Sequence, residues 1–272
     1  MKLTMASAPA PAPRYSIDAL VRGLEILGLF SPESPTISFS EVVERLRLTK
    51  STAFRALATL ETMGYVERVP GSRRYRPGLK ALELGFTALN SLEVRQVARP
   101  YLERLAQETD ETASLGVLDE LRVIYVDRVR DRAIVGVMLG VGDHVAAHCT
   151  ALGKVLLAAL PPEERARRLA QAELAAFTPD TITDAPALLA ELAAVSRAGY
   201  AVDDGELAVG LRAVAAPVRN ATQQVVAAIN VSGPAMTISR ARLIDEITPL
   251  VVGSAGQISR ALGSPRAPDQ DE

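Results

Sequence analysis

One stretch of the sequence, residues 48–76, limits the possible folds more than any other. Thr49 can cap a helix there, because its hydroxyl can accept a hydrogen bond from the free amides of the first turn. Ala53, Leu57 and Leu60 then recur at positions i, i+4 and i+7, which gives the helix one apolar stripe. The stretch therefore begins with an amphipathic helix that can pack on a core.

A basic hairpin is expected directly after this helix. Gly64 ends the helix, and residues 65–69 and 74–76 are predicted as two short strands around a turn at residues 70–73. A helix followed by a hairpin with a basic tip predicts a winged helix-turn-helix. An ordinary amphipathic helix followed by a solvated hairpin would show the same pattern, so a second observation has to separate the two.

Charge is distributed unevenly along the chain. Residues 45–76 hold eight basic and two acidic residues, a net charge of +6. The whole chain has 30 basic and 32 acidic residues, so the remainder, with 22 basic and 30 acidic residues, carries −8. One basic patch on an otherwise acidic protein is the electrostatic footprint of nucleic-acid binding.

The outward face of the predicted helix suits a DNA major groove. It presents short side chains, hydroxyl groups and cations, which can come close to base edges and phosphates. The candidate DNA-binding residues of the helix and the wing are Lys50, Ser51, Thr52, Arg55, Arg73 and Arg74. Among them we expect Arg55, with the two hydroxyl side chains, to contact base edges, and the other cations to contact phosphates or the minor groove.

Two further helices are predicted upstream. The first opens at Ser16, and its apolar residues recur at 3-4-3 spacing, as a seam for its own domain or for a partner: Ile17, Leu20, Leu24 and Leu27. The second opens with a capping box, Ser38 at the cap and Glu41 three residues later. These helices complete the order helix, helix, turn, helix and wing.

Composition bounds the rest of the chain. With 272 residues, 48% hydrophobic and 23% charged, it is long enough for two globular domains. A single cysteine excludes an intrachain disulfide, no apolar run approaches the roughly 18 residues of a membrane span, and a cytoplasmic setting is expected. Residues 1–13 and 264–272 are predicted as a disordered arm and a disordered tail.

A linker helix is expected at residues 78–92. Leu79, Leu82, Phe86 and Leu89 recur at 3-4-3 spacing, about two heptads of a seam that would pair with the same helix in a second subunit. We expect residues 14–77 to form the DNA-binding domain on one side of this helix. Arg99-Pro100 is expected to break or restart the following helix.

Residues 93–263 are predicted to form an α+β sensor domain. Strands in runs, with helices on one side, favour this class over a doubly wound sheet. The predicted strands are residues 112–118, 122–129, 133–139, 211–218 and 225–232, and the predicted helices are residues 151–160, 161–176, 185–198 and 242–262.

Three features of this domain indicate a small-molecule site. Thr150 is predicted to cap a helix, so the amides of residues 151–153 would point free from a helix N-terminus and favour a carboxylate. Asn230 and Ser232 share one face of an otherwise apolar strand. Asp203 lies in an acidic loop and can accept from a ligand hydroxyl. A helix cap, a solvent-facing strand and a solvated loop are the structural alternatives.

The sequence gives little support for a catalytic site or a metal site. Gly153-Lys154 resembles part of a phosphate loop but lacks its other residues. His148 and Cys149 are adjacent, so they cannot easily form the hydrogen bond that a nucleophile and its base need. His144, His148 and Cys149, with Asp127, could ligate a metal, but two histidines four residues apart are weak evidence. We therefore expect no enzyme, no cofactor and no metal.

Several motifs together resemble the IclR family of bacterial transcription regulators. They follow the winged helix and linker in order: His-Cys-Thr-Ala-Leu-Gly-Lys at 148–154, Gly-Tyr-Ala-Val-Asp-Asp-Gly-Glu at 199–206, Gly-Leu-Arg-Ala-Val-Ala-Ala-Pro-Val at 210–218 and Ala-Ala-Ile-Asn-Val-Ser at 227–232. The resemblance covers residues 14–263. It implies dimers or tetramers that bind palindromic operators, and a GAF-like effector domain.

The resemblance also implies which residues contact a carboxylate effector. They are Ala151 and Leu152 through the backbone, Asp203, Leu211, Ala213, Asn230 and Ser232, with Val137 and Val145 on the apolar side. Within the family the motifs look most like the branch of PcaR, PcaU and PobR, whose members respond to aromatic acids or β-ketoadipate. The small Ala213 leaves room for a ring and favours an aromatic acid.

A transcription regulator controlled by such an acid is therefore the expected function. The alternatives are a regulator of a different carbon-source pathway, a sensor domain with an enzymatic output, and a non-specific architectural DNA binder. Salt-dependent binding with operator preference would favour either kind of regulator over the sensor with an enzymatic output and the architectural DNA binder.

Overall fold

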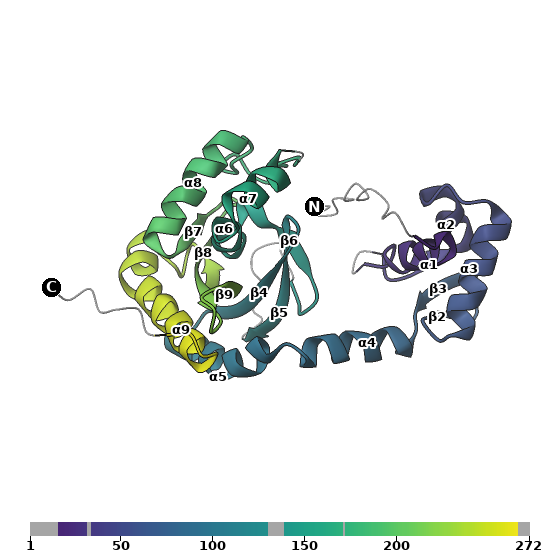
Figure 1. Cartoon of the computed structure of the whole chain (residues 1–272), viewed down its shortest axis with the longest axis horizontal. Coiled ribbons are helices and arrows are strands. Elements are labelled where there is room, and N and C mark those ends of the chain that lie inside the picture. Colours follow the sequence, from purple (N-terminus) through teal and green to yellow (C-terminus); the bar gives the residue numbers. More distant parts are fainter. Residues whose placement is uncertain (1–15, 32–33, 130–138, 171, 266–272) are drawn as a thin grey trace. The chain divides into compact units, whose positions relative to one another are not determined.

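The computed structural model describes residues 16–31, 34–129, 139–170 and 172–265. The chain forms two compact units, Met1–Ser91 and Leu92–Glu272 (Figure 1). Most of the strand predicted at 133–139, including Val137, lies outside the described residues.

The N-terminal unit contains four helices and a small sheet among its described residues. In chain order the elements are α1 (Asp18–Leu27), β1 (Ile37–Ser38), α2 (Phe39–Arg45), α3 (Lys50–Thr62), β2 (Val66–Arg68), β3 (Arg74–Pro77) and α4 (Leu79–Asn90). Both predicted caps are confirmed. Ser38 Oγ accepts from the Glu41 amide at 3.2 Å while Glu41 Oε2 accepts from the Ser38 amide at 2.7 Å, and Thr49 Oγ1 accepts from the Thr52 amide at 3.2 Å.

A single apolar core joins the three helices to the wing. The antiparallel sheet has the order β1-β3-β2, and Ile37 of β1 pairs with Tyr75 of β3. Strand β1 was not predicted, because two residues are too short to show an alternating pattern. The buried residues of this core are Ile26, Ile37, Val42, Ala53, Leu57, Val66 and Tyr75. The predicted helix-turn-helix with a wing is confirmed.

Two apolar seams of this unit face solvent. On α1 and just before it, Ile17, Leu20 and Leu24 are exposed, whereas Leu27 at the end of this seam packs against the domain core. On α4 the predicted seam is exposed at Leu79, Leu82 and Phe86, while Leu89 is half-buried. Both seams are therefore available to a partner.

The C-terminal unit opens with a continuous helix, α5 (Glu93–Thr109), which contains Pro100. The break predicted at Arg99-Pro100 is wrong, and the interruption lies between Asn90 and Glu93 instead. Pro100 is exposed, so its ring and the carbonyl that loses a hydrogen bond lie on the solvent side of the helix. The opposite side stays packed through Leu102 and Leu105.

A six-stranded antiparallel sheet forms the middle of this unit, in the order β6-β5-β4-β9-β8-β7. Its strands are β4 (Thr112–Asp119), β5 (Arg122–Val129), β6 (His144–Ala146), β7 (Ala201–Asp204), β8 (Leu211–Arg219) and β9 (Val225–Pro234). Its helices are α6 (Ala151–Ala158), α7 (Pro162–Leu169), α8 (Ala185–Ala198) and α9 (Thr248–Ala261), with a 3₁₀ turn at Ala147–Cys149 and a π-helical turn at Arg242–Ile247. The predicted α+β class is confirmed.

Helices cover both faces of the sheet, not one as predicted. Residues 227–233 of β9 are all buried, which requires cover on both sides because successive side chains of a strand alternate. Ser259 Oγ of α9 accepts from the Arg219 amide of β8 at 2.9 Å. Figure 1 shows α6 and α8 on one side of the sheet and α5 and α9 on the other. The central strands therefore read as nearly continuous apolar runs.

Two other local predictions were wrong. Asp203 lies on the edge strand β7, where it pairs with Ala213 of β8, and not in a loop. The helix predicted at 161–176 ends at Leu169. The strand at Asp203 depends on pairing with β8, which local composition does not report.

Candidate functional site

The first candidate site is the outward face of α3. Its buried face consists of Ala53 and Leu57, so the side of the helix away from these two residues is turned outward. Lys50, Ser51 and Arg55 are exposed. Thr52 is half-buried, and its hydroxyl lies 2.8 Å from the Thr49 hydroxyl, next to the cap. Three of the four predicted α3 residues are therefore exposed to solvent, and the fourth, Thr52, lies at the edge of the exposed face.

Sequence reasoning missed an aromatic residue on this same helix. Phe54 directly precedes Arg55, and its side chain is 59% exposed. The search for hydroxyls and cations overlooked it, although its spacing of one residue from Ala53 already placed it away from the centre of the apolar stripe. An exposed ring among cations is an additional feature of this surface.

The two wing arginines have different surroundings. Arg73 is exposed at the hairpin tip. Arg74 is turned into its own domain, where it donates to Thr36 Oγ1 at 2.8 Å and to the Thr36 carbonyl at 2.7 Å, and forms an ion pair of 3.0 Å with Glu41. Hydrogen bonds from Ser38, and then Arg74, lower the pKa of Glu41 to about 2. Arg74 therefore holds the wing to the second helix.

The two acidic residues of the basic segment, residues 45–76, form ion pairs with arginines of the same segment. Glu61 pairs with Arg68 at 3.0 Å, and Glu67 pairs with Arg76. Both pairs are exposed, so each contributes little stability. They neutralise two of the eight cations counted in the sequence, and Glu41 neutralises a third, Arg74. The remaining cations of the segment are Arg45, Arg47, Lys50, Arg55 and Arg73, all of them exposed.

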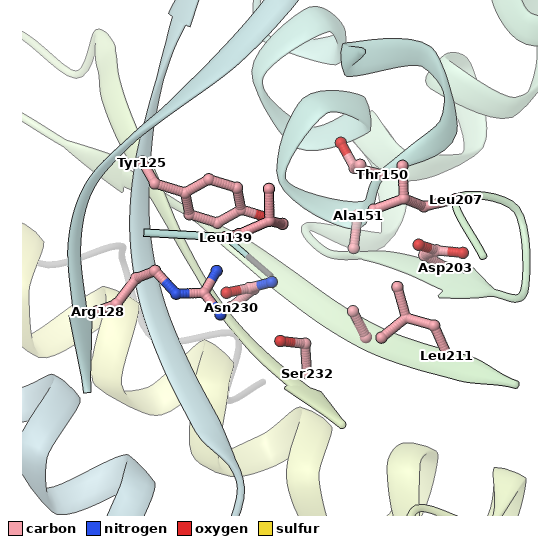
Figure 2. A pocket seen from close by; sticks show the side chains of 11 residues that line it. Tyr125, Arg128, Leu139, Thr150, Ala151, Asp203, Leu207, Leu211, Asn230 and Ser232 are labelled. Carbon is pink, nitrogen blue, oxygen red and sulfur yellow. The ribbon is translucent and has the colours of Figure 1, made fainter. Parts of the chain in front are cut away.

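The second candidate site is a pocket in the C-terminal unit, between α6 and the sheet (Figure 2). It contains about 360 Å³ of empty space, part of it continuous with solvent. The lining residues are Tyr125, Arg128, Leu139, Thr150, Ala151, Asp203, Leu207, Leu211, Ala213, Asn230 and Ser232. Six residues predicted for the effector line this one pocket, so widely separated segments meet there as expected.

The start of α6 supplies free backbone donors to the pocket. Thr150 Oγ1 accepts from the Gly153 amide at 3.1 Å, so this amide, predicted to be free, is already used by the cap. Among the described residues the amides of Ala151 and Leu152 have no acceptor. These two donors, at the positive end of the helix dipole, can bind an anion.

Gly153 is fixed by a close approach of backbone. A Cβ added at this position would lie 2.1 Å from the carbonyl oxygen of Ala147. Only glycine therefore allows α6 to start where its first amides face the pocket. This contact explains the glycine of the Ala-Leu-Gly-Lys motif without a phosphate-loop function.

Three predicted residues do not line the pocket in the described structure. Leu152 is fully buried, and its side chain packs on β4, where it approaches Gly116. Its expected contact is through the backbone amide, which this orientation leaves available. Val145 is buried on β6 opposite Val123. Val137 lies outside the described residues.

Asp203 contributes an unusual carboxyl group. It is buried on β7, and its Oδ1 accepts from the Glu206 amide at 2.8 Å. Burial, with the nearby Glu206 charge, raises the pKa of Asp203 to about 7 against the opposing effect of Lys154. Near neutral pH this carboxyl therefore exists in both forms and can either donate or accept a hydrogen bond.

Asn230 and Ser232 project from the central strand β9 into the pocket (Figure 2). The Asn230 side chain is 4% exposed, and its Oδ1 has no hydrogen-bond partner among the described residues. Buried polar atoms almost always have a partner. A buried acceptor left open inside a pocket indicates a site for a donor from a ligand or from water.

Tyr125 and Arg128 were not predicted, and a β-bulge explains why. Strict alternation would place residues three apart on opposite faces of a strand. In the pairing of β4 with β5, Leu115 faces Asp127 while Gly116 faces Tyr125, so Val126 is the extra residue. The shift in phase lets Tyr125 and Arg128 line the same pocket, with the Arg128 guanidinium 4.8 Å from the centre of the Tyr125 ring.

Lys154 is part of an internal ion pair. Its side chain is 2% exposed, and its amine binds Glu206 and lies 3.3 Å from both Glu191 Oε1 and the Val202 carbonyl oxygen. This pair ties α6 to α8 and to the segment after β7. The amine is therefore committed to structure, which agrees with the rejection of a phosphate loop.

The histidine and the cysteine before α6 also have structural surroundings. His148 Nε2 lies 3.0 Å from the Ala175 carbonyl oxygen, and the buried Cys149 thiol donates to the Ala146 carbonyl oxygen. Burial raises the pKa of Cys149 and lowers that of His148, so the thiol stays protonated. In the part of the chain that the structure describes, no group of three or more metal-binding side chains comes together.

Among the described helices, none combines the length and the apolar composition that crossing a bilayer would require.

Family models match both units. Residues 19–70 match the IclR helix-turn-helix domain, and residues 86–260 match the domain described as bacterial transcriptional regulator IclR C-terminal. The second match alone spans most of the C-terminal unit and the end of α4.

Individual proteins are similar over nearly the full length. The chain is 32% identical over 249 residues to the HTH-type transcriptional regulator XynR of Escherichia coli K12, covering 92% of this chain and 98% of the relative. It is 30% identical over 245 residues to the Pca regulon regulatory protein of Pseudomonas putida, covering 90% and 84%.

A solved structure has the same arrangement of elements. It is an IclR homologue from Microbacterium hydrocarbonoxydans in complex with 4-hydroxybenzoate, with a TM-score of 0.78, 28% identity, and coverage of 90% of this chain and 98% of that one. With both domain models and these relatives in agreement, the chain belongs to the IclR family of DNA-binding transcription regulators, which are not enzymes and which carry an effector-binding domain.

Proposed function

We propose that this regulator binds a palindromic operator as a homodimer, or as a tetramer of two dimers, in the cytoplasm, and that a small carboxylate controls this binding. The effector is an aromatic acid or a β-ketoadipate-type metabolite of aromatic catabolism. The observation that carries the proposal is the pocket in which free α6 amides and the open Asn230 Oδ1 face the same space.

The polar groups of the pocket favour an acid that also carries a hydrogen-bond donor. The amides of Ala151 and Leu152 and the guanidinium of Arg128 attract an anion. Asn230 Oδ1 needs a donor, which a hydroxyl supplies. A hydroxylated acid therefore satisfies more of these groups than a simple alkyl carboxylate, whereas a keto acid would leave Asn230 Oδ1 to a water molecule.

The apolar walls favour a ring. Leu139, Leu207 and Leu211 line the pocket, and Ala213 leaves space beside them. Figure 2 shows Tyr125 and Arg128 on one side of the pocket and Asp203 and Leu211 on the other, with Asn230 between them. The similarity to the Pca regulon regulatory protein and to the 4-hydroxybenzoate complex supports the same class of ligand.

The N-terminal unit supports operator binding by a dimer. The outward face of α3, with Arg55 and Ser51, would enter the major groove, and Arg73 would reach the backbone or the minor groove. The exposed seams of α1 and α4 would be buried against a second copy. Two reading helices related by a two-fold axis fit a palindromic operator.

The test is footprinting and calorimetry on the DNA upstream of the gene for this chain. We expect salt-dependent protection of a palindromic site, and a change in that protection with 4-hydroxybenzoate, protocatechuate or β-ketoadipate. Because linkage is reciprocal, operator DNA must change the effector affinity by the same factor. Protection that ignores all three acids but responds to another carbon-source metabolite would reassign the effector, and absence of salt-dependent binding would reject the operator.

A further inference from the structure

Phe54 is a large apolar side chain in the first half of α3 that lies outside the domain core. It is 59% exposed, while the core face of α3 is already formed by Ala53 and Leu57. Single exposed apolar residues are common on proteins, so exposure alone decides nothing. The neighbours of the ring indicate what kind of partner covers it.

These neighbours fit DNA better than they fit a protein. Phe54 lies four residues after Lys50 and three after Ser51, which places all three on adjacent positions of one helix side. Arg55 follows it directly and is exposed. An apolar protein partner covering the ring would remove both cations from water without counter-charges, which is costly. DNA supplies phosphates for the cations and an apolar group for the ring.

The position of Phe54 along α3 also favours DNA as the partner. Phe54 is in the first half of α3 (Lys50–Thr62), and the N-terminal residues of a recognition helix are those that contact base edges. In the major groove the C5-methyl group of thymine is the apolar group among the base edges, and phenylalanine is one of the side chains that contacts it.

We propose that Phe54 determines operator sequence by packing on the C5-methyl group of a thymine in each half-site. Arg55 and Ser51 then read hydrogen-bonding groups of the neighbouring bases. This inference rests on the operator binding proposed above and adds a specificity that hydrogen bonds alone would not give, because it depends on a methyl group.

The experiment replaces single thymines of the footprinted operator by deoxyuridine, which removes the methyl group and keeps the hydrogen-bonding edge. With the wild-type protein we expect one symmetric pair of positions at which affinity falls about fourfold per half-site, the effect of losing one buried methyl contact. All other thymines should tolerate the change. This scan needs no altered protein, so folding of a variant cannot affect it.

Variants then assign the effect to the ring. Phe54→Ala should bind the thymine and deoxyuridine operators equally, and Phe54→Leu, which keeps an apolar side chain, should retain part of the difference. Met63→Ala is the matched control, because Met63 is also 59% exposed and caps the far end of α3. It should keep the full sensitivity.

The inference is overturned if no thymine is sensitive in the wild-type protein, or if Phe54→Ala remains as sensitive as the wild type. Either result leaves operator binding itself intact. Loss of salt-dependent operator binding by the wild-type protein would instead overturn the proposed function, so the two failures are distinguishable.

Discussion

The two units present their functional groups in opposite ways. In the N-terminal unit the candidate residues of α3 point outward and make few contacts with the rest of the protein, as Arg55 and Ser51 show. In the C-terminal unit the candidate residues are buried and contributed by strands far apart in sequence, as Asp203 and Asn230 show. Outward residues can change without affecting the fold, whereas most inward residues serve both the fold and the ligand.

The strongest test of this contrast is Gly153→Ala. The new Cβ would collide with the Ala147 carbonyl oxygen, 2.1 Å away, and backbone on both sides cannot yield cheaply. We expect the free energy of unfolding of the C-terminal unit to fall by about 3 kcal/mol, together with loss of effector binding. Urea denaturation and effector calorimetry measure the two effects.

Gly253→Ala is the matched control for that variant. Gly253 lies in α9, and a Cβ there would meet nothing within 4 Å. Replacing an exposed helical glycine by alanine should stabilise the unit by about 0.5–1 kcal/mol. If the two substitutions had effects of the same sign, the close contact at the start of α6 would not be what requires Gly153.

The sequence also predicted the two units to different extents. Features of the N-terminal unit were easier to predict than those of the pocket. The caps at Thr49 and Ser38 and the apolar stripe of α3 depend on residues three or four apart, and the sequence displays such spacings directly. Arg74 was placed on DNA because its acceptor at Thr36 lies 38 residues earlier and no local pattern reveals it. Local signals therefore sufficed for the helix and its caps, and not for the surroundings of the wing residue Arg74.

The pocket was predictable only in part, for physical reasons. Asn230 and Ser232 were found because polar residues at spacing two stand out in an apolar strand. Arg128 was missed because the extra residue in β5 shifts the alternation, and a bulge leaves no mark in composition. Asp203 was placed in a loop because pairing with β8, not local propensity, makes its segment a strand.

The next prediction concerns the outward residues. Arg55→Ala should reduce discrimination between operator and unrelated DNA by about 1–3 kcal/mol. Arg73→Ala should weaken binding to all DNA similarly and lower the salt slope by about one. Both should leave the free energy of unfolding within about 0.5 kcal/mol. Binding assays at several salt concentrations measure the slopes.

Arg74→Ala is the comparison within the wing. Its guanidinium holds Thr36 and Glu41, so its removal should lower the stability of the N-terminal unit as well as DNA affinity. A loss of discrimination from Arg73→Ala, or none from Arg55→Ala, would show that the roles assigned to the two residues are wrong.

A smaller effect is expected from the titration of Asp203. Its pKa in the folded protein is raised to about 7 by burial, while in the unfolded chain it is about 4. Between these values the folded protein keeps a proton that the unfolded chain has released, so stability falls as pH rises through this window. The slope is at most about 1.4 kcal/mol per pH unit. Asp203→Asn should remove this slope, as measured by urea denaturation from pH 5 to 8.

The neighbouring carboxylate provides the control. Asp204 is also on β7, and despite some desolvation the hydrogen bonds from Arg212 and Arg240 hold its pKa below the usual value. Asp204→Asn should therefore leave the slope between pH 5 and 7 in place. Parallel stability curves for the wild type and Asp203→Asn would mean that Asp203 is ionised throughout.

The smallest expected effect concerns Asn230. Although this residue is buried, we expect its replacement to change ligand binding and not stability, as for the exposed residues of α3. Asn230 Oδ1 makes no hydrogen bond in the described structure, so Asn230→Ala removes no hydrogen bond that the fold makes to this oxygen. We expect stability without ligand to change by less than about 0.5 kcal/mol, while effector affinity falls about tenfold through loss of a hydrogen bond worth about 1–1.5 kcal/mol. Ser259→Ala should do the reverse, because Ser259 Oγ is buried and joins α9 to Arg219. If Asn230→Ala destabilised the free protein as much as Ser259→Ala, its side chain would be part of the fold rather than a site kept open for a ligand.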